Sequence, residues 1–207
     1  MQLKAEQISF RYHRKKPWIL NNVSLAIKCG ERVGIVGPSG YGKSTLAKIF
    51  ATYLQPTLGE ITLDGKPIPS KGYCPVQMIY QHPELSVNPR LKMRKILNEA
   101  WQPDKDLLEK MGIENCWLSR WPSELSSGEL QRFCIARALH PQTQFLICDE
   151  MTTMLDVITQ AQIWQVLLEI SKERNLGMLI ITHNEALAKR VCNRIITLPQ
   201  IKHLKSL

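Results

Sequence analysis

One run near the N-terminus combines glycines, a lysine and hydroxyl side chains at a spacing that suits phosphate binding. The run Gly37-Pro38-Ser39-Gly40-Tyr41-Gly42-Lys43-Ser44-Thr45 fits the pattern G-x-x-x-x-G-K-[ST]. Glycines let the backbone wrap closely around an anion, so that several N–H groups point inward. Lys43 can neutralise the β- and γ-phosphates of a nucleotide, and Ser44 can offer its hydroxyl to Mg²⁺. The run therefore predicts a nucleotide-binding loop.

A second run of interest ends in two carboxylates. The apolar residues Phe145–Cys148 are followed directly by Asp149 and Glu150. An aspartate delivered by a buried strand beside a phosphate-binding loop is what a Mg²⁺ site requires. Glu150 is then suited to accept a proton from an attacking water, a contribution that is typically 10²–10⁴-fold for a well-placed general base.

The run from Leu125 to Arg132 has two interpretations, which both remain open at this point. Ser126-x-x-Glu129 fits a capping box, which predicts the start of a helix. The same geometry, with a serine hydroxyl, the glycine Gly128 and a helix N-terminus, also suits a second anion site.

Alternating strands and helices must position these residues. The apolar run Arg32–Val36 reads as a strand before the loop, and a helix is expected from Leu46. Alternation of this kind predicts a mostly parallel sheet with helices on both faces. The phosphate loop, Gln81, Asp149 and His183 all follow strand ends, where such sheets bind ligands. The other expected strands are Val76–Tyr80, Phe145–Cys148, Met178–Thr182 and Arg194–Leu198, and the other expected helices are Glu129–Leu139, Val157–Arg174 and Asn184–Val191.

Two regions depart from this alternation. Near the N-terminus, Leu3–Tyr12 and Val23–Ile27 are predicted to pair as strands. From Leu91 to Leu118 the apolar spacing is helical, with Pro103 separating two helices. This second region predicts a helical insertion within the α/β core.

Composition narrows the classes of protein further. The chain has 207 residues, 44% of them hydrophobic, which predicts one globular domain. It lacks a run of the roughly 20 apolar residues that a bilayer-spanning helix needs, and its first residues lack a signal-peptide core, so we expect a cytoplasmic protein.

The six cysteines are scattered singly, which predicts reduced thiols and no zinc or iron–sulfur site. The net charge of +9 suits nucleic acid, an acidic partner or anionic lipid. The basic run His13–Lys16 is predicted to be a solvated loop, because no aromatic residues alternate with its charges.

With these motifs in order, the chain resembles the ATP-binding-cassette (ABC) ATPases over nearly its whole length. The resemblance implies their P-loop fold, with a mostly parallel sheet, an N-terminal antiparallel β subdomain and an inserted helical subdomain. It implies a single domain over residues 1–207, with a core of 1–80 and 140–207 and a helical subdomain of about 82–139. The motifs that carry it are Gly37–Thr45 (Walker A), Gln81 (Q-loop), Leu125–Glu129 (signature), Phe145–Glu150 (Walker B), Leu155-Asp156 (D-loop) and His183 (switch histidine).

By this resemblance the chain hydrolyses ATP with Mg²⁺, and two subunits pair head to tail. Each ATP then lies between the phosphate loop of one subunit and the signature of the other, where Ser126 and Gly128 close the partner's site. Tyr12 lies where the family places an aromatic ring against adenine, and Asp156 belongs to the same composite site. The roles implied near the phosphates are Ser44, Gln81 and Asp149 for the metal and Glu150, His183 and Gln81 for hydrolysis.

A narrower resemblance concerns the substrate. The run from Gln81 to Arg90, together with Gly128–Arg132, resembles the peptide and nickel importer ATPases. It implies import of a small solute, with membrane permease subunits, a second ATPase subunit, identical or different, and indirectly an extracytoplasmic solute-binding protein as partners. The chain would lie peripherally on the cytoplasmic face of the membrane, with no nucleic-acid partner. Alternatives are a generic proline-containing loop, another transported substrate, a nucleic-acid ATPase of the same superfamily and a small P-loop kinase, which would not need Leu125–Glu129.

The chain also departs from the family's usual residues. Ser127 replaces the first signature glycine, Met151 a proline, Met154 a small residue and His82 an acidic residue. We expect these changes to alter the efficiency of the composite site and not nucleotide binding. Because the sequence ends soon after Leu198, we also expect no regulatory C-terminal domain.

Overall fold

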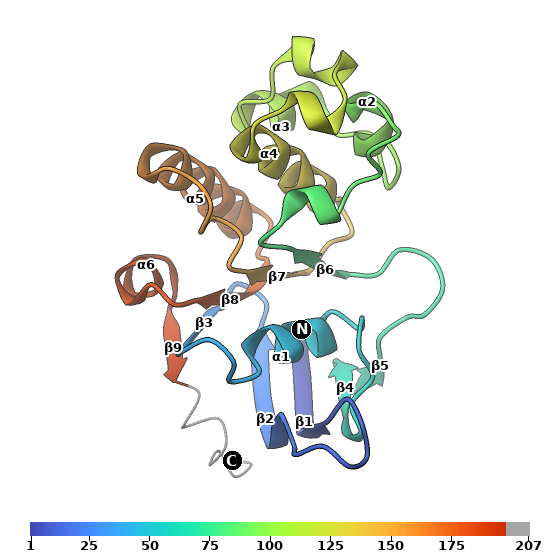
Figure 1. The fold of residues 1–207 in the computed structure, drawn as a ribbon, viewed down its shortest axis with the longest axis vertical. Helices are drawn as coiled ribbons and strands as arrows, with labels where there is room; N and C mark the ends of the chain where they lie inside the picture. The colour runs from blue at the N-terminus through green and yellow to red at the C-terminus, as the bar shows by residue number, and fades with distance from the viewer. Residues whose placement is uncertain (198–207) are drawn as a thin grey trace.

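The computed structural model describes residues 1–197, which form two sheets with helices between and around them. A four-stranded sheet has the strand order β2-β1-β4-β5, and a five-stranded sheet has the order β6-β7-β8-β3-β9. Figure 1 shows α1 and the first sheet on one side of the second sheet and the helical segment, with α2, α3 and α4, on the other side. This is the predicted architecture of an antiparallel subdomain, a parallel core and an inserted helical part.

The antiparallel sheet contains the two N-terminal strands that the sequence predicts. β1 (Gln2–Phe10) pairs with β2 (Leu20–Lys28), with Leu3 opposite Ile27. The second strand begins earlier than predicted, because Leu20 pairs with Phe10. The other edge of β1 is covered by the remaining strands of this sheet, β4 (Leu58–Leu63) and β5 (Lys66–Pro67).

The second sheet is parallel throughout, as predicted. Its central strands are fully or almost fully buried, because apolar residues face helices or the other sheet on both sides. The expected last strand includes Leu198, which lies outside the described residues. In spatial order its strands are β6 (Val76–Ile79), β7 (Phe145–Asp149), β8 (Gly177–Thr182), β3 (Arg32–Val36) and β9 (Arg194–Thr197).

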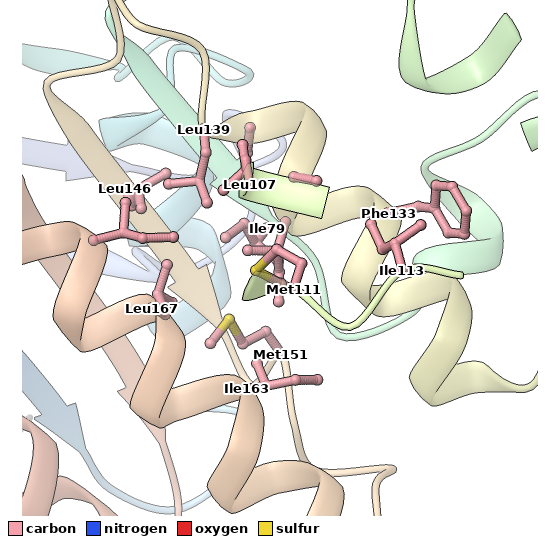
Figure 2. Close-up of a cluster of buried hydrophobic side chains, with 14 of the residues drawn as sticks. Ile79, Leu107, Met111, Ile113, Phe133, Leu139, Leu146, Met151, Ile163 and Leu167 are labelled. Atoms are coloured by element: carbon pink, nitrogen blue, oxygen red, sulfur yellow. The ribbon is translucent and has the colours of Figure 1, made fainter. Parts of the chain in front are cut away.

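Helices cover both faces of the parallel sheet. On one face, α1 (Lys43–Phe50) packs in an apolar cluster with the antiparallel sheet. On the other face, α5 (Val157–Glu173) and α6 (Glu185–Val191) share a second cluster with the helical segment. Figure 2 shows this second cluster extending from Leu167 beside the sheet to Phe133 in the helical segment. The division into core and helical subdomain stays a prediction, and one continuous cluster crosses its boundary.

The helical segment is more broken than the apolar spacing predicts. The stretch expected to be two helices forms α2 (Met93–Leu97) and α3 (Lys105–Lys110), with Pro103 between them. Three short 3₁₀ turns lie around them, and α4 (Ser127–Ala138) is the long helix of this segment. The turns form because prolines begin two of them, where no helix can continue from the preceding residue.

Across the part of the chain that the structure describes, every helix is too short or too polar to cross a membrane.

Candidate functional site

The phosphate loop joins β3 to α1 in the strand–turn–helix order that its sequence predicts. Gly42 caps the helix with a φ of 89°. A side chain there would place its Cβ 2.9 Å from Cγ2 of Ile19, so glycine is required by both conformation and space. No side chain within residues 1–197 caps this helix, which leaves its first N–H groups available to an anion.

Lys43 is held within the loop. Its side chain is 5% exposed, and its Nζ donates to the carbonyl oxygens of Gly37 and Pro38, each at 2.7 Å. No carboxylate among the described residues forms an ion pair with it. The positive charge is therefore positioned but not neutralised, which suits a phosphate.

A cavity of about 410 Å³ opens beside the loop. Its volume lies in the usual range for small-molecule sites. Ile19 is a lining residue that was not predicted from the sequence. It contacts the position that a side chain at Gly42 would occupy. Nothing in the sequence around Ile19 indicates a role in ligand binding. The lining residues are Ile19, Ser39, Gly40, Gly42, Lys43, Ser44, Thr45, Gln81 and Glu150.

The register of three neighbouring strands brings distant residues to the edge of the sheet beside this cavity. β3, β8 and β7 end almost level, with Val36 opposite Thr182 and Asp149 opposite Ile181. The loop after β3, His183 after β8 and Glu150 after β7 therefore emerge at the same edge. This agrees with the rule that parallel sheets bind ligands at the carboxyl ends of their strands.

Ser44 and Asp149 meet at this edge. The Ser44 Oγ donates to Oδ1 of Asp149 at 3.1 Å, and Gln81 lines the cavity with Ser44. Hydroxyl, carboxylate and amide oxygens are the donors that Mg²⁺ prefers. The described residues contain no group of three or more His, Cys, Asp or Glu suited to a metal. The residues thus fit a Mg²⁺ whose remaining ligands would be water and nucleotide phosphates.

Burial raises the pKa of the Asp149 carboxyl above its ordinary value of 3.8, and the Ser44 hydrogen bond opposes part of that rise. With a raised pKa, the native state holds more protons than the unfolded state between pH 3.8 and the higher native value. Stability therefore falls as the pH rises through that window.

We predict that Asp149→Asn raises the Tm of the nucleotide-free protein at pH 7, because the neutral amide avoids the cost of burying a charge. The gain should shrink as the pH falls from the raised native pKa of Asp149 toward 3.8 and should be absent below that value. Thermal unfolding at several pH values, with Asp106→Asn on the exposed face of α3 as control, measures the effect. An equal Tm change in both variants would contradict it.

Glu150 and His183 form a pair at the end of neighbouring strands. Oε2 of Glu150 lies 3.3 Å from Nδ1 of His183. Glu150 has a φ of 48°, and its N–H donates to the carbonyl of Ile181 at 3.0 Å. A left-handed conformation is costly for a residue other than glycine, and such strain concentrates at functional sites. The backbone conformation of Glu150 thus fixes the position from which its side chain extends.

Ser126 forms the predicted capping box at the start of α4. Its Oγ accepts from the Glu129 N–H at 3.2 Å, and Glu129 Oε2 accepts from the Ser126 N–H at 2.7 Å. Gly128 faces the start of α5, where an added Cβ would lie 3.2 Å from Cγ2 of Thr159. Asp156 caps α5 by accepting the N–H groups of Ile158 and Thr159. Signature and D-loop residues therefore share one surface, apart from the cavity lining.

Tyr12 also lies outside the cavity lining. It follows β1 and is 56% exposed, with its ring edge-on to Phe10 at a centroid distance of 5.0 Å. A solvent-facing aromatic ring of this kind has a free face for stacking.

The sequence interpretation missed a link between α4 and the Q-loop. Gln131 is 1% exposed, and its Nε2 donates to the carbonyl of Tyr80 at 3.2 Å, directly before Gln81. The available signal was a glutamine next to Leu130 on the apolar side of the helix. A buried amide there holds the strand end that carries Gln81.

The four departures occupy different environments. Met151 is 3% exposed and packs near Ile163 in the apolar cluster (Figure 2). Met154 is 55% exposed, and Ser127 is the exposed first residue of α4. His82 pairs with Glu84, with 3.1 Å between Nδ1 and Oε1. None of the four lines the cavity among the described residues.

Comparison with known proteins agrees with this geometry. Residues 20–153 match the ABC transporter family, a range that holds the loop, Gln81 and the two carboxylates. The nickel import ATP-binding protein NikE of Escherichia coli strain K12 is 33% identical, covering 87% of this chain and 74% of that protein. A probable peptide ABC transporter ATP-binding protein, y4tS of Sinorhizobium fredii, is 32% identical, covering 93% of this chain and 63% of its own length.

Solved structures agree as well. The dimeric bacterial ABC transporter cassette MJ0796 superposes with a TM-score of 0.79 at 27% identity, covering 94% of this chain and 93% of that one. A post-hydrolysis dimer of the same cassette, bound to ADP and Pi, gives a TM-score of 0.80 at 26% identity over the same shares of the two chains.

Proposed function

Since the chain belongs to the ABC transporter family, we propose that it is the ATP-binding subunit of an importer for a small solute. The chain is an ATPase of this family. One observation carries the proposal: Lys43, Ser44 and Glu150 line one cavity, and at its edge Ser44 contacts Asp149 and Glu150 contacts His183.

ATP binds in the cavity beside the phosphate loop. Lys43 moves its ammonium from the carbonyls of Gly37 and Pro38 to the phosphates, where charge-assisted hydrogen bonds are stronger. The N–H groups of the loop and of the first turn of α1 surround the same oxygens. Tyr12 stacks on the adenine.

Ser44, Asp149 and Gln81 would hold Mg²⁺. The ion supplies Lewis-acid stabilisation of phosphate charge when it is bound. Asp149 must be ionised for this, and the Ser44 hydrogen bond already favours its charged form.

Glu150 accepts a proton from the water that attacks the γ-phosphate. His183 holds the carboxylate through the 3.3 Å contact to Nδ1, and its Nε2 is left to face the γ-phosphate. Gln81 faces both the metal and the phosphate from the end of β6.

A second ATPase subunit completes the site. Ser126, Gly128 and Asp156 lie together but do not line the cavity of their own chain. The exposed start of α4 presents a hydroxyl and a helix N-terminus, which suit the phosphates held by another copy. Closure then draws its energy from the extra contacts that bound ATP makes across the dimer.

We predict that Ser126→Ala leaves ATP binding unchanged and lowers turnover at least tenfold in a homodimer. The substitution also removes a helix cap, which costs about 1 kcal/mol of stability. Asp104→Ala is the matched control, because Asp104 Oδ1 caps α3 by accepting the Leu107 N–H at 2.8 Å. Equal losses of turnover in both variants would assign the effect to stability alone. Full turnover in Ser126→Ala would show that a different subunit supplies the closing surface.

The permease docks in a groove between the core and the helical segment. The groove encloses about 490 Å³, and its lining includes Tyr53, Tyr80, Leu85 and Arg137. Leu85 is 81% exposed and Tyr53 is 59% exposed, so two large apolar side chains face solvent at this groove, as is typical of a protein interaction site.

Two contacts connect this groove with α4 and the ATP site. Arg137 of α4 donates to the carbonyl of Ser86 at 2.5 Å, and Gln131 of α4 donates to that of Tyr80. Motion of α4 against Gln81 therefore reaches the permease through the groove.

Leu85→Asp tests the proposed function. The charge should abolish copurification with a membrane permease while ATP binding by the isolated chain stays unchanged, because Leu85 does not line the ATP cavity. Membrane pull-down with mass spectrometry identifies the permease and any second ATPase. The exposed Leu58 of β4, changed to Asp, is the control for an added surface charge. Failure of the wild-type chain to recover any permease would contradict the proposal.

The transported solute is a peptide or a nickel or other metal complex, on the strength of the names of the relatives NikE and y4tS. An extracytoplasmic solute-binding protein and the permease select that solute, and the permease holds this chain at the cytoplasmic face of the membrane. The competing function is a nucleic-acid ATPase, favoured by the net charge of +9. DNA-stimulated, salt-sensitive hydrolysis would support that alternative.

A further inference from the structure

We infer that a basic patch on α2 binds the anionic headgroups of the membrane, beside the groove that receives the permease. The inference rests on the proposed docking of a permease in that groove. The patch, called here the α2 basic patch, consists of Arg90, Lys92, Arg94 and Lys95.

The fold separates the two sides of α2. Met93, Ile96 and Leu97 are at most 2% exposed and pack in the apolar cluster. Arg94 and Lys95 of the helix are exposed, as are Arg90 and Lys92 before it. The apolar side fixes the helix, so the basic side chains are presented together on one surface.

The charge of this patch is not neutralised locally. From Leu85 to Asn98 the sequence contains four basic residues and no acidic one. Within residues 1–197, none of the four forms an ion pair. The nearby Glu99 pairs instead with Arg137 at 3.2 Å. An unpaired cluster of this size attracts an anionic surface.

An exposed tryptophan adjoins the patch. The Nζ of Lys92 lies 5.8 Å from the ring centroid of Trp121, which is 41% exposed. The Met93 N–H donates to the carbonyl of Arg120 at 2.9 Å, which fixes this neighbour against α2. The backbone N–H of Trp121 donates to Oε2 of Glu124 at 2.6 Å, so this carboxylate contacts Trp121. Tryptophan beside lysine and arginine is the combination that favours the headgroup region of a bilayer.

The position of the patch makes the membrane its partner. Ser86 and Ala100 both line the groove and flank α2 in the sequence, so α2 adjoins the groove's border. A permease seated in the groove places that border toward the bilayer.

Charge then selects among the possible partners. Cytoplasmic loops of membrane proteins carry excess lysine and arginine, which repel this patch, whereas the cytoplasmic leaflet is negative. Single-stranded nucleic acid would need several stacking rings, and the patch has one.

Vesicle flotation of the full chain tests the inference. The chain should bind vesicles of phosphatidylcholine mixed with phosphatidylglycerol, and not phosphatidylcholine alone. Each lysine or arginine near an anionic surface raises the binding constant about fivefold. The triple variant K92Q/R94Q/K95Q should therefore bind anionic vesicles about 100-fold more weakly than the wild type. Binding by the wild type should fall at 1 M salt, where the screening length is about 3 Å. Basal ATPase activity of the triple variant should match the wild type, which verifies its fold.

The control is R14Q/K15Q/K16Q, which removes the same charge from the exposed loop after β1. This variant should keep its vesicle binding. The inference is overturned by equal binding to both vesicle types, by loss of binding in the loop variant instead, or by a preference for a short DNA duplex over anionic vesicles. Permease recovery with Leu85→Asp is a separate measurement. A failure to bind vesicles would therefore overturn this inference without contradicting the proposed importer function. Vesicle binding without any permease would instead contradict the proposed function.

Discussion

Replacing Glu150 with Gln should lower ATP turnover by about 10²–10⁴-fold while ATP binding survives. The amide keeps the length of the side chain but cannot accept a proton from water. In the proposed mechanism ATP binding drives dimer closure and hydrolysis reverses it, so a closed, ATP-bound dimer should accumulate. Steady-state phosphate release, ATP binding and size-exclusion chromatography with ATP measure the three expectations.

A matched control separates this effect from a general loss of carboxylate. Glu185→Gln makes the same change at an exposed position in the first turn of α6, two residues beyond His183. Its turnover should remain within about twofold of the wild type, because it lies outside the cavity lining. Unchanged turnover in Glu150→Gln would exclude Glu150 as the base.

Replacing Lys43 with Met should weaken ATP binding about 100-fold or more. A hydrogen bond to a charged group contributes about 1.5–3 kcal/mol, and in the proposed site Lys43 contacts two phosphates. The methionine keeps much of the apolar stem while removing the ammonium. Nucleotide titration of the purified chain, with and without Mg²⁺, measures the loss.

The same helix offers a control for this charge. Lys48→Met removes a positive charge one turn further along α1, from a side chain that lines the permease groove and not the ATP cavity. Its nucleotide affinity should stay near that of the wild type. The two carbonyls that Lys43 contacts, those of Gly37 and Pro38, lose a donor in Lys43→Met, so Tm is recorded for each variant. Retention of ATP binding by Lys43→Met at unchanged Tm would contradict the phosphate role.

Much of the fold follows from consecutive residues. The parallel strands have β-branched or apolar runs, and the capping box at Ser126 marks the start of α4 within two residues of its prediction. The region after Leu91 was less predictable. Its apolar spacing suggested two helices, whereas α2 has five residues and 3₁₀ turns fill much of the remainder. Short helices depend on tertiary packing, because nucleation is costly and few internal hydrogen bonds compensate for it.

The chemical groups can be identified from local sequence: a phosphate loop, two carboxylates after an apolar strand, and a histidine after another. Each depends on neighbours in the chain, since turn geometry and strand burial are local properties. Which of these groups meet depends on the packing of the strands. Ser44 reaches Asp149 across 105 positions, and Glu150 reaches His183 across 33, because β7, β8 and β3 lie side by side and end level.

The basic side of α2 likewise became a patch only once its apolar side was buried. Strand order and helix orientation result from the packing of many similar apolar side chains. No single stretch of sequence encodes that packing, which is why these positions had to come from the fold.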